Sequence, residues 1–183
     1  MPETMQDVAL LSKCARSCRH LEGDVAEAGV YYGASARLLA RFFEGTNKTI
    51  HLFDVFDKMP PKHEGKDPLG KVFPHYTTIE EAKGVLADFD NIKFYKGLFK
   101  DTLKEVADKK FCFVHVDCDL YDGAKDSCEF FYPRMVVGGV MMFHDYGTSK
   151  FPGIQLAVEE FFIDKPDLRV TNRFGSHHVM VKR

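Results

Sequence analysis

Short apolar segments alternate with stretches of helical spacing along this chain, and this alternation restricts the fold more than any other feature. Strands are expected at residues 24–28, 49–53, 91–96, 111–116 and 136–143. Helices are expected at residues 5–20, 34–43, 78–88, 102–109, 122–132 and 152–163. Two more strands, at residues 168–172 and 176–181, would form a closing antiparallel hairpin that turns near Phe174 and Gly175. The pattern predicts an α/β fold with a doubly wound, mostly parallel sheet of about seven strands.

Local sequence features refine this prediction. The FCFVHV run at residues 111–116 is almost continuously apolar, which is typical of a central parallel strand covered on both faces. Thr78 followed by Glu81 predicts a capping box at the start of a helix. The fifth strand is expected to cross a turn at Gly138 and Gly139. Residues 57–76 are rich in Pro and Gly, so we expect a long loop there that serves as a lid or contacts substrate.

The composition is that of an ordinary globular chain with one core, and a single domain is expected over residues 1–183. Lys and Arg number 25 against 27 Asp and Glu, and this balance argues against nucleic-acid binding, which needs a basic face. No apolar run approaches the ~20 residues of a membrane span. Charges within residues 1–20 argue against a signal peptide, so a cytoplasmic location is expected. The 5 cysteines form no C-x-x-C pair and are expected to be reduced and mostly buried.

Polar residues follow the ends of the predicted strands, where sheets of this kind bind their ligands. The first strand ends in Glu27 and leads into Gly29 and Gly33, which permit a tight turn and a close approach of the backbone to a ligand. The second strand ends in Asp54, about 20 residues beyond Gly33. An acidic residue at that distance suits the hydroxyls of a ribose. The alternative for Asp54 is a capping or solvated carboxylate.

The two glycines and the nearby acid indicate what kind of nucleoside would bind. Their spacing is G-x-x-x-G, and not the G-x-G-x-x-G of nicotinamide-binding folds, so a pyrophosphate site is disfavoured. The negative charge of Glu27 disfavours phosphate and favours an ammonium group. S-adenosylmethionine therefore fits this site better than NAD.

Asp117, Asp119, His144 and Asp145 follow the fourth and fifth predicted strands. Carboxylates that converge on one cleft repel one another unless a cation is present, so a divalent metal is expected. Such an ion lowers the pKa of a bound alcohol, and a nearby carboxylate can take its proton. Asp117 and Asp119 reach the same site only if the strand ends before them. The alternative for Asp119 is to cap the following helix.

Five motifs, in the same order, resemble the macrocin O-methyltransferase (TylF/NovP-like) family over about residues 22–163. They are EAGVYYG at residues 27–33, FDVF at 53–56, KGLFKDTL at 96–103, VDCDLY at 116–121, and HDYG at 144–147 followed by Pro152 and Gly153. The resemblance implies a class I, S-adenosylmethionine-dependent and metal-dependent enzyme with a Rossmann-like sheet. It also implies methylation of a hydroxyl on a small sugar-containing or polyhydroxylated acceptor.

The resemblance also implies roles for individual residues. Asp119 would be the catalytic general base, and Asp117, His144 and Asp145 would bind the metal. The cofactor would be held by Glu27, Gly29, Gly33, Ser35, Asp54, Gly97, Leu98, Phe99 and Asp117.

His144 stands where the family usually has an acid, which leaves the metal open. Magnesium prefers oxygen ligands, whereas imidazole suits manganese, zinc, iron or nickel. Either the ion differs, or His144 turns away from a magnesium ion on Asp117 and Asp145, or His144 is the base of a metal-free site. Only about twenty residues precede the first strand, so we expect the cleft to be open or covered by a neighbouring subunit, as in a homodimer.

Two other functions remain open. The E-x-G-x-x-x-G-x-S turn, from Glu27 to Ser35, also matches catechol-type O-methyltransferases. A nonenzymatic module could bind S-adenosylmethionine without chemistry. His51, His177 and His178 are interpreted as packing or surface residues.

Overall fold

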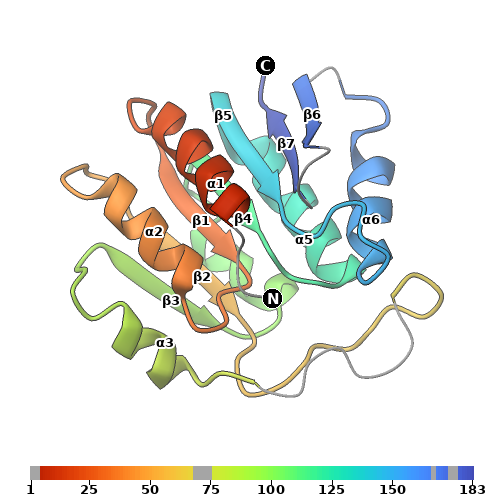
Figure 1. Cartoon of the computed structure of the whole chain (residues 1–183), viewed down its shortest axis with the longest axis horizontal. Coiled ribbons are helices and arrows are strands. Elements are labelled where there is room, and N and C mark those ends of the chain that lie inside the picture. Colours follow the sequence, from red (N-terminus) through yellow and green to blue (C-terminus); the bar gives the residue numbers. More distant parts are fainter. Residues whose placement is uncertain (1–4, 68–75, 166–167, 173–176) are drawn as a thin grey trace.

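The computed structural model describes residues 5–67, 76–165, 168–172 and 177–183, and its strands form one sheet of order β3-β2-β1-β4-β5-β7-β6 (Figure 1). The strands are β1 Asp24–Ala28, β2 Ile50–Asp54, β3 Ile92–Lys96, β4 Phe111–Val116, β5 Met135–Phe143, β6 Leu168–Asn172 and β7 His177–Val181. Strands β1 to β5 pair in parallel, and β7 pairs antiparallel with both β5 and β6. The predicted doubly wound sheet with a closing antiparallel pair is confirmed. The expected turn at Phe174 and Gly175 lies outside the described residues.

Helices cover both faces of the sheet (Figure 1). The α-helices are α1 Met5–Cys18, α2 Ala34–Phe43, α3 Ile79–Val85, α4 Phe99–Thr102, α5 Tyr121–Phe131 and α6 Pro152–Phe162. Helices α1 and α2 lie on one face and α5 and α6 on the other. No helix in the described ranges combines the length and the apolar character that crossing a bilayer requires.

The core has two halves because neighbouring strand residues point to opposite faces. Val25 and Phe113 pack with α1 and α2, whereas Ala26 and Val114 pack with α5 and α6. Every residue of β4 is buried, as its apolar sequence predicted. The strand order reverses between β1 and β4, so the chain leaves these two adjacent strands toward opposite faces. Ligands of open α/β sheets bind at such a point.

Three expected elements differ from the structure. The helix expected at residues 102–109 is instead α4 followed by a 3₁₀ helix at Leu103–Val106. Leu103 and Val106, three residues apart, are both buried, which matches the three-residue turn of a 3₁₀ helix. The other two differences are the early end of α3 at Val85 and the continuity of β5 through Gly138 and Gly139. The two glycines coincide with an irregularity in the pairing of β4 with β5 and not with a turn.

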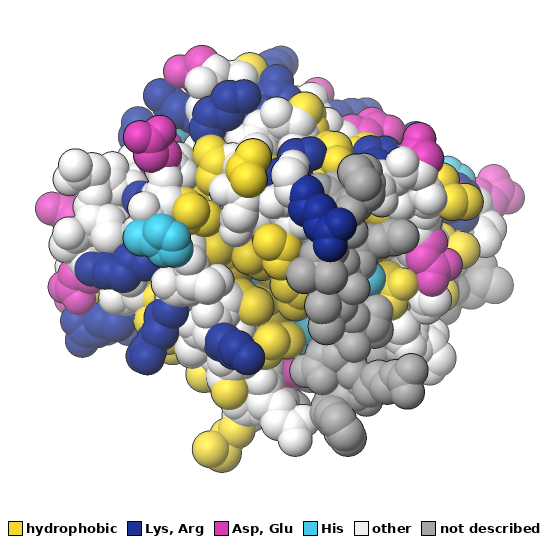
Figure 2. All heavy atoms as spheres, turned by 90° about the horizontal axis from the view of Figure 1, so that it is seen from above, with side chains coloured by type: hydrophobic (Ala, Val, Ile, Leu, Met, Phe, Trp, Pro, Cys, Tyr) yellow, Lys and Arg dark blue, Asp and Glu magenta, His cyan; other side chains and the backbone are white. Residues whose placement is uncertain are grey.

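Seen from above, hydrophobic side chains gather near the middle of the molecule, and Lys and Arg side chains lie around them (Figure 2). Asp and Glu side chains are interspersed toward the edges of the same face. The mixture agrees with the near balance of charge in the sequence.

Candidate active site

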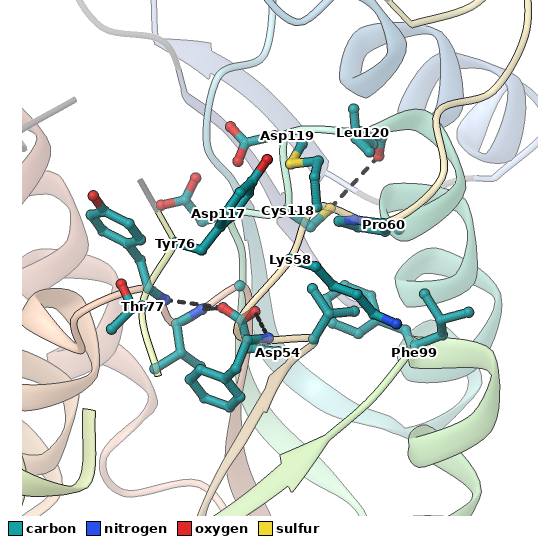
Figure 3. Close-up of a pocket in the computed structure, with 18 of the residues that line it drawn as sticks. Asp54, Lys58, Pro60, Tyr76, Thr77, Phe99, Asp117, Cys118, Asp119 and Leu120 are labelled. Atoms are coloured by element: carbon teal, nitrogen blue, oxygen red, sulfur yellow. Dashed lines mark hydrogen bonds between the residues drawn. The ribbon is translucent and has the colours of Figure 1, made fainter. Parts of the chain in front are cut away.

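A cavity of about 840 Å³ lies at the carboxyl ends of the central strands. Its lining comes from the segments that follow β1, β2, β3, β4 and β5, and the segment after β2 is the long loop. The described part of that loop contributes Lys58, Pro60, Tyr76 and Thr77 (Figure 3). Residues 68–75 of the same loop lie outside the described ranges. Loop and sheet together enclose a space of the size that small-molecule sites have.

Gly29 allows the ends of β1 and β4 to approach closely. Its φ is +94°, and a Cβ atom built on it would lie 1.9 Å from the carbonyl oxygen of Asp117. No side chain fits there, so the turn after β1 needs glycine for contact with the protein backbone as well as for its conformation. Gly33, with φ +84°, is the N-cap of α2. The turn leaves the first residues of α2, among them Ser35, on the cavity wall.

Asp54 holds this turn in place from the neighbouring strand. Its Oδ2 accepts hydrogen bonds from the backbone N–H groups of Val30 at 2.7 Å and Tyr31 at 3.0 Å. Its Oδ1 accepts one from the N–H of Phe56 at 2.9 Å (Figure 3). A carboxylate has about four acceptor positions, so about one remains for a ligand hydroxyl. The carboxylate therefore organises the protein and still lines the cavity.

Asp117, His144 and Asp145 converge in the cavity wall. His144 Nδ1 lies 3.1 Å from Asp117 Oδ1 and 3.2 Å from Asp145 Oδ2. One ligand atom from each residue lies within 4.8 Å of the others. Strand β4 ends at Val116, before Asp117, as the sequence required. Asp119 and Asp145 both have positive φ, at 64° and 58°, a conformation that Asp tolerates better than most residues.

The pKa values of these groups depend on one another. Burial alone would lower the pKa of His144, but Asp117 and Asp145 outweigh it and raise the pKa to about 11. Burial would raise the pKa of Asp117, yet the contact with His144 holds that pKa below its ordinary value. Burial and the charges of Asp117 and Asp145 raise the pKa of Asp119 well above its ordinary value. The pKa of Asp119 is therefore shifted toward neutrality.

A row of buried polar side chains lies behind the cavity, on the face covered by α1. Glu27 and His115 are paired in register on β1 and β4, and Glu27 Oε1 contacts His115 Nδ1 at 2.8 Å. The rings of His115 and His144 have centroids 6.4 Å apart. Those of His144 and His177 are 4.6 Å apart, and His177 Nδ1 lies 3.1 Å from Asp7 Oδ1. We call these residues the buried histidine row.

The structure gathers most of the predicted site residues around the cavity. The predicted residues that line it are Gly29, Ser35, Asp54, Leu98, Phe99, Asp117, Asp119, His144 and Asp145. Glu27, Gly33 and Gly97 are absent from the described lining, and Glu27 is fully buried. Tyr31, Tyr32 and Tyr76 also line the cavity, although no role was expected for them. Tyr31 and Tyr32 lie in the glycine turn and Tyr76 lies in the long loop. Their positions in these two features were the sequence signal that could have identified them as site residues.

Comparison with known proteins agrees with this geometry. The family model described as macrocin-O-methyltransferase (TylF) matches residues 5–168. The chain belongs to this family. The match spans nearly all the elements that form the cavity and confirms the family that the five motifs indicated.

Two curated relatives are O-methyltransferases of Streptomyces species. One is the 8-demethyl-8-(2,3-dimethoxy-alpha-L-rhamnosyl)-tetracenomycin-C 4'-O-methyltransferase of Streptomyces olivaceus, 29% identical over 69% of this chain and 54% of the relative. Another is the demethyldecarbamoylnovobiocin O-methyltransferase of Streptomyces niveus, 27% identical over 78% of this chain and 59% of the relative. The chain thus spans a little over half the length of these relatives.

Solved structures confirm the fold. The O-methyltransferase NovP superposes with a TM-score of 0.80 at 22% identity, covering 97% of this chain and 80% of that one. The calicheamicin methyltransferase CalS11 has a TM-score of 0.79 at 17% identity, covering 99% of this chain and 80% of that one. The sheet described above is therefore the Rossmann-like sheet of methyltransferases.

Proposed function

We propose that this chain is an S-adenosylmethionine-dependent O-methyltransferase acting on a hydroxyl of a small, sugar-containing or polyhydroxylated acceptor, with help from a divalent metal ion. One observation supports it above the others. A single cavity is lined both by the glycine turn with Asp54 and by the Asp117–His144–Asp145 group. The family match and the glycosylated acceptor named for the tetracenomycin relative favour the same chemistry.

The cavity residues around the glycine turn and Asp54 fit the cofactor. S-adenosylmethionine supplies a methyl group on a sulfonium. The acceptor position that Asp54 keeps would take a ribose hydroxyl, and Leu98 and Phe99 offer apolar surface beside it. Glu27 does not line the cavity but is buried next to Ser35, which does. The negative charge of Glu27 would therefore favour a cationic ligand in the cavity.

Asp117, His144 and Asp145 fit a divalent ion. Such an ion, when bound, lowers the pKa of an acceptor hydroxyl. Asp117, His144 and Asp145 would hold it, because each offers a ligand atom within 4.8 Å of the others. His144 points into the group and contacts both carboxylates, which favours an ion that accepts nitrogen, such as manganese or zinc. Magnesium held by the two carboxylates and water is the second choice.

Asp119 is the proposed general base. Its pKa is raised by burial and by the neighbouring carboxylates, and a base works best when its pKa lies near the operating pH. His144 is less suited, because its Nδ1 faces Asp117 and Asp145 and would be occupied by the ion that these residues hold. Asp117 and Asp119 lie near each other in the cavity wall (Figure 3).

Asp119→Asn should leave the affinity for S-adenosylhomocysteine near that of the wild type and lower turnover about 10²–10⁴-fold, because the amide keeps the shape and loses the base. Calorimetry measures the first quantity and S-adenosylhomocysteine release the second. Asp122→Asn is the matched control, since Asp122 also lines the cavity and should lose little activity. Unchanged turnover in Asp119→Asn would remove this residue from the mechanism.

Asp145→Ala should abolish both turnover and its dependence on added metal, because it removes one of the two carboxylates that face His144. The measurement is turnover after chelation and after stepwise addition of Mg²⁺ or Mn²⁺. Wild-type protein should lose activity on chelation and regain it with the ion. Full, chelator-insensitive activity in Asp145→Ala would reject the metal site.

Two comparisons separate the alternatives. A catechol-type enzyme chelates two adjacent oxygens, so higher turnover on catechols than on glycosylated acceptors would favour that function. A nonenzymatic binding module would bind S-adenosylmethionine, release no S-adenosylhomocysteine with any acceptor, and respond to no chelator.

A further inference from the structure

Three buried side chains from distant parts of the sequence meet beneath helix α1. Asp7 belongs to α1, His144 follows β5, and His177 begins β7. Their exposed fractions are 7%, 8% and 2%. One ligand atom from each residue lies within 4.8 Å of the others. This inner group is a different set from Asp117, His144 and Asp145, and the two sets share only His144.

The spacing of the inner group is that of ligands around one ion. His177 Nδ1 and Asp7 Oδ1 are 3.1 Å apart. The rings of His144 and His177 meet edge to face, with an interplanar angle of 77° and centroids 4.6 Å apart. Two ligands on a tetrahedral ion with bonds of about 2.0–2.2 Å are separated by roughly 3.3–3.6 Å. The Asp7–His177 pair therefore needs only a small adjustment to bind one metal ion, and the ligand atom of His144 lies within 4.8 Å of both.

Two atoms of the group lack a hydrogen-bond partner. Within the described residues, His177 Nδ1, which faces Asp7, makes no hydrogen bond of acceptable geometry, although it is shielded from solvent. His144 Nδ1 makes none either, but this atom faces the outer group, Asp117 and Asp145. Buried polar atoms in native proteins nearly always have a partner, and each exception calls for an explanation such as a missing ion. The carboxylates beside these nitrogens are at contact distance but poorly directed for hydrogen bonding.

We propose that Asp7, His144 and His177 form an inner site for a divalent transition-metal ion of the Zn²⁺ or Co²⁺ type. Two imidazoles and one carboxylate are a common zinc ligand set, and a water molecule completes a tetrahedral shell. Mg²⁺ is excluded by its preference for an octahedron of oxygens. The site fastens α1 to β7 behind the cavity. It does not depend on the proposed methyl transfer, because Asp7 and His177 are absent from the described cavity lining.

The test uses Asp145→Ala as its starting protein, because this change dismantles the outer group and leaves the inner one. After removal of metal by chelation and dialysis, Zn²⁺ at about 100 times its Kd should raise the Tm of Asp145→Ala by about 5–10 °C. Mg²⁺ at the same concentration should leave the Tm unchanged. Co²⁺ should give the visible absorption of a four-coordinate ion with nitrogen ligands.

A second substitution locates the ligands. Adding His177→Gln to Asp145→Ala should abolish the Zn²⁺ shift and the Co²⁺ absorption, and adding Asp7→Asn should weaken both. Adding His51→Gln is the matched control, since His51 is an equally buried histidine beside a carboxylate, Asp24, on another strand. It should keep the full metal response. Circular dichroism without metal establishes that each variant is folded.

The results separate clearly. A Zn²⁺ shift in Asp145→Ala that His177→Gln removes and His51→Gln preserves supports the inner site. Absence of any Zn²⁺ or Co²⁺ response in Asp145→Ala overturns it, as does a response that survives both His177→Gln and Asp7→Asn. If His177→Gln prevents folding, two other results test the inner site. Asp145→Ala should still show the Co²⁺ absorption, and adding Asp7→Asn should weaken it; failure of either result overturns the inner site. No cofactor or acceptor enters the test, so a failure of the proposed methyl transfer leaves its result intact.

Discussion

At the scale of single residues, Asp54 has a larger structural role than its sequence context indicates. Its distance from the glycine turn predicted contact with a ribose. The structure adds that both carboxylate oxygens accept backbone N–H groups, from Val30, Tyr31 and Phe56. The two roles are compatible, because a carboxylate has more acceptor positions than these bonds use. One side chain thus shapes the turn and would also face the ligand.

Asp54→Ala should destabilise the fold by about 1–3 kcal/mol, because it leaves partly buried N–H groups without an acceptor. Affinity for S-adenosylhomocysteine should fall as well, since the turn after β1 loses its anchor. Urea unfolding and calorimetry measure the two effects. Asp57→Asn is the control: asparagine tolerates the positive φ at this position, and the exposed ion pair with Lys96 that is lost should contribute at most about 1 kcal/mol. Equal stability of the two variants would contradict this account of Asp54.

Some residues of the site could not be assigned from the sequence. Glu27 was expected to face the ligand, yet it is fully buried against His115. His115 lies within an apolar strand and gave no local indication of a polar partner. Their contact follows from the register of β1 with β4, which depends on the packing of the whole sheet. The same holds for Asp7 and His177, which meet only because α1 covers the face to which β7 contributes.

At the scale of elements, local rules predicted best where one short motif decides the structure. The capping box of Thr78 and Glu81 is present at the start of α3, with both of its hydrogen bonds. The breaker-rich stretch after β2 forms a loop beside the cavity, as predicted. The structure of the residues around α4 was harder to predict, because Leu103 and Val106 suit either an α-helix or a 3₁₀ helix. The burial of both residues in the core favours the 3₁₀ helix.

The glycine turn gives a prediction at this scale. Gly29→Ala should destabilise the protein by about 3–5 kcal/mol, the sum of a strained positive φ and a clash with the backbone of Asp117. Gly84→Ala is the opposite case, because Gly84 lies within α3 and a Cβ there would meet nothing within 4 Å. It should stabilise by about 0.5–1 kcal/mol. Thermal or urea unfolding compares the two, and a tolerated alanine at 29 would refute the close approach of β1 and β4.

At the scale of the whole molecule, the two halves of the core enclose most of the thiols. All 5 cysteines are free, and Cys18, Cys112 and Cys128 are buried, in agreement with the expectation of mostly buried thiols. Burial raises the pKa of Cys18 and of Cys112 to about 11. Burial raises the pKa of Cys128 as well. A thiol that is both shielded and protonated reacts slowly.

Alkylation should therefore report the integrity of the entire fold. In native protein at pH 8, iodoacetamide should modify Cys14 before the three buried thiols, because Cys14 is partly exposed. Cys118 is also partly exposed, but burial and the charges of Asp119 and Asp117 raise its pKa well above the ordinary value, so it should react more slowly than Cys14. Mass spectrometry of peptides follows each site. Modification of Cys18, Cys112 and Cys128 should appear together as urea reaches the unfolding transition. Fast alkylation of Cys128 in native protein would contradict the packing of α5 on the sheet.

The overall topology was predictable because each strand and helix has its own periodicity, and right-handed crossovers leave few ways to connect them. The strand order, which places Asp117 beside Gly29, was not predicted and comes from the structure. Distances inside the cavity were not predictable. They depend on how far the ends of β1 and β4 approach each other, and a single missing Cβ at Gly29 decides this.

The buried histidine row affects how the protein is made. Asp7 leaves the ribosome 170 residues before His177, yet the two side chains contact each other in the folded molecule. Until β7 has emerged, α1 has no histidine partner at this position, and the row beneath it stays incomplete. The interior on this face therefore closes only after β7 has been made. Until then, the edge of β5 that β7 will cover is exposed to the aggregation that partly folded chains undergo.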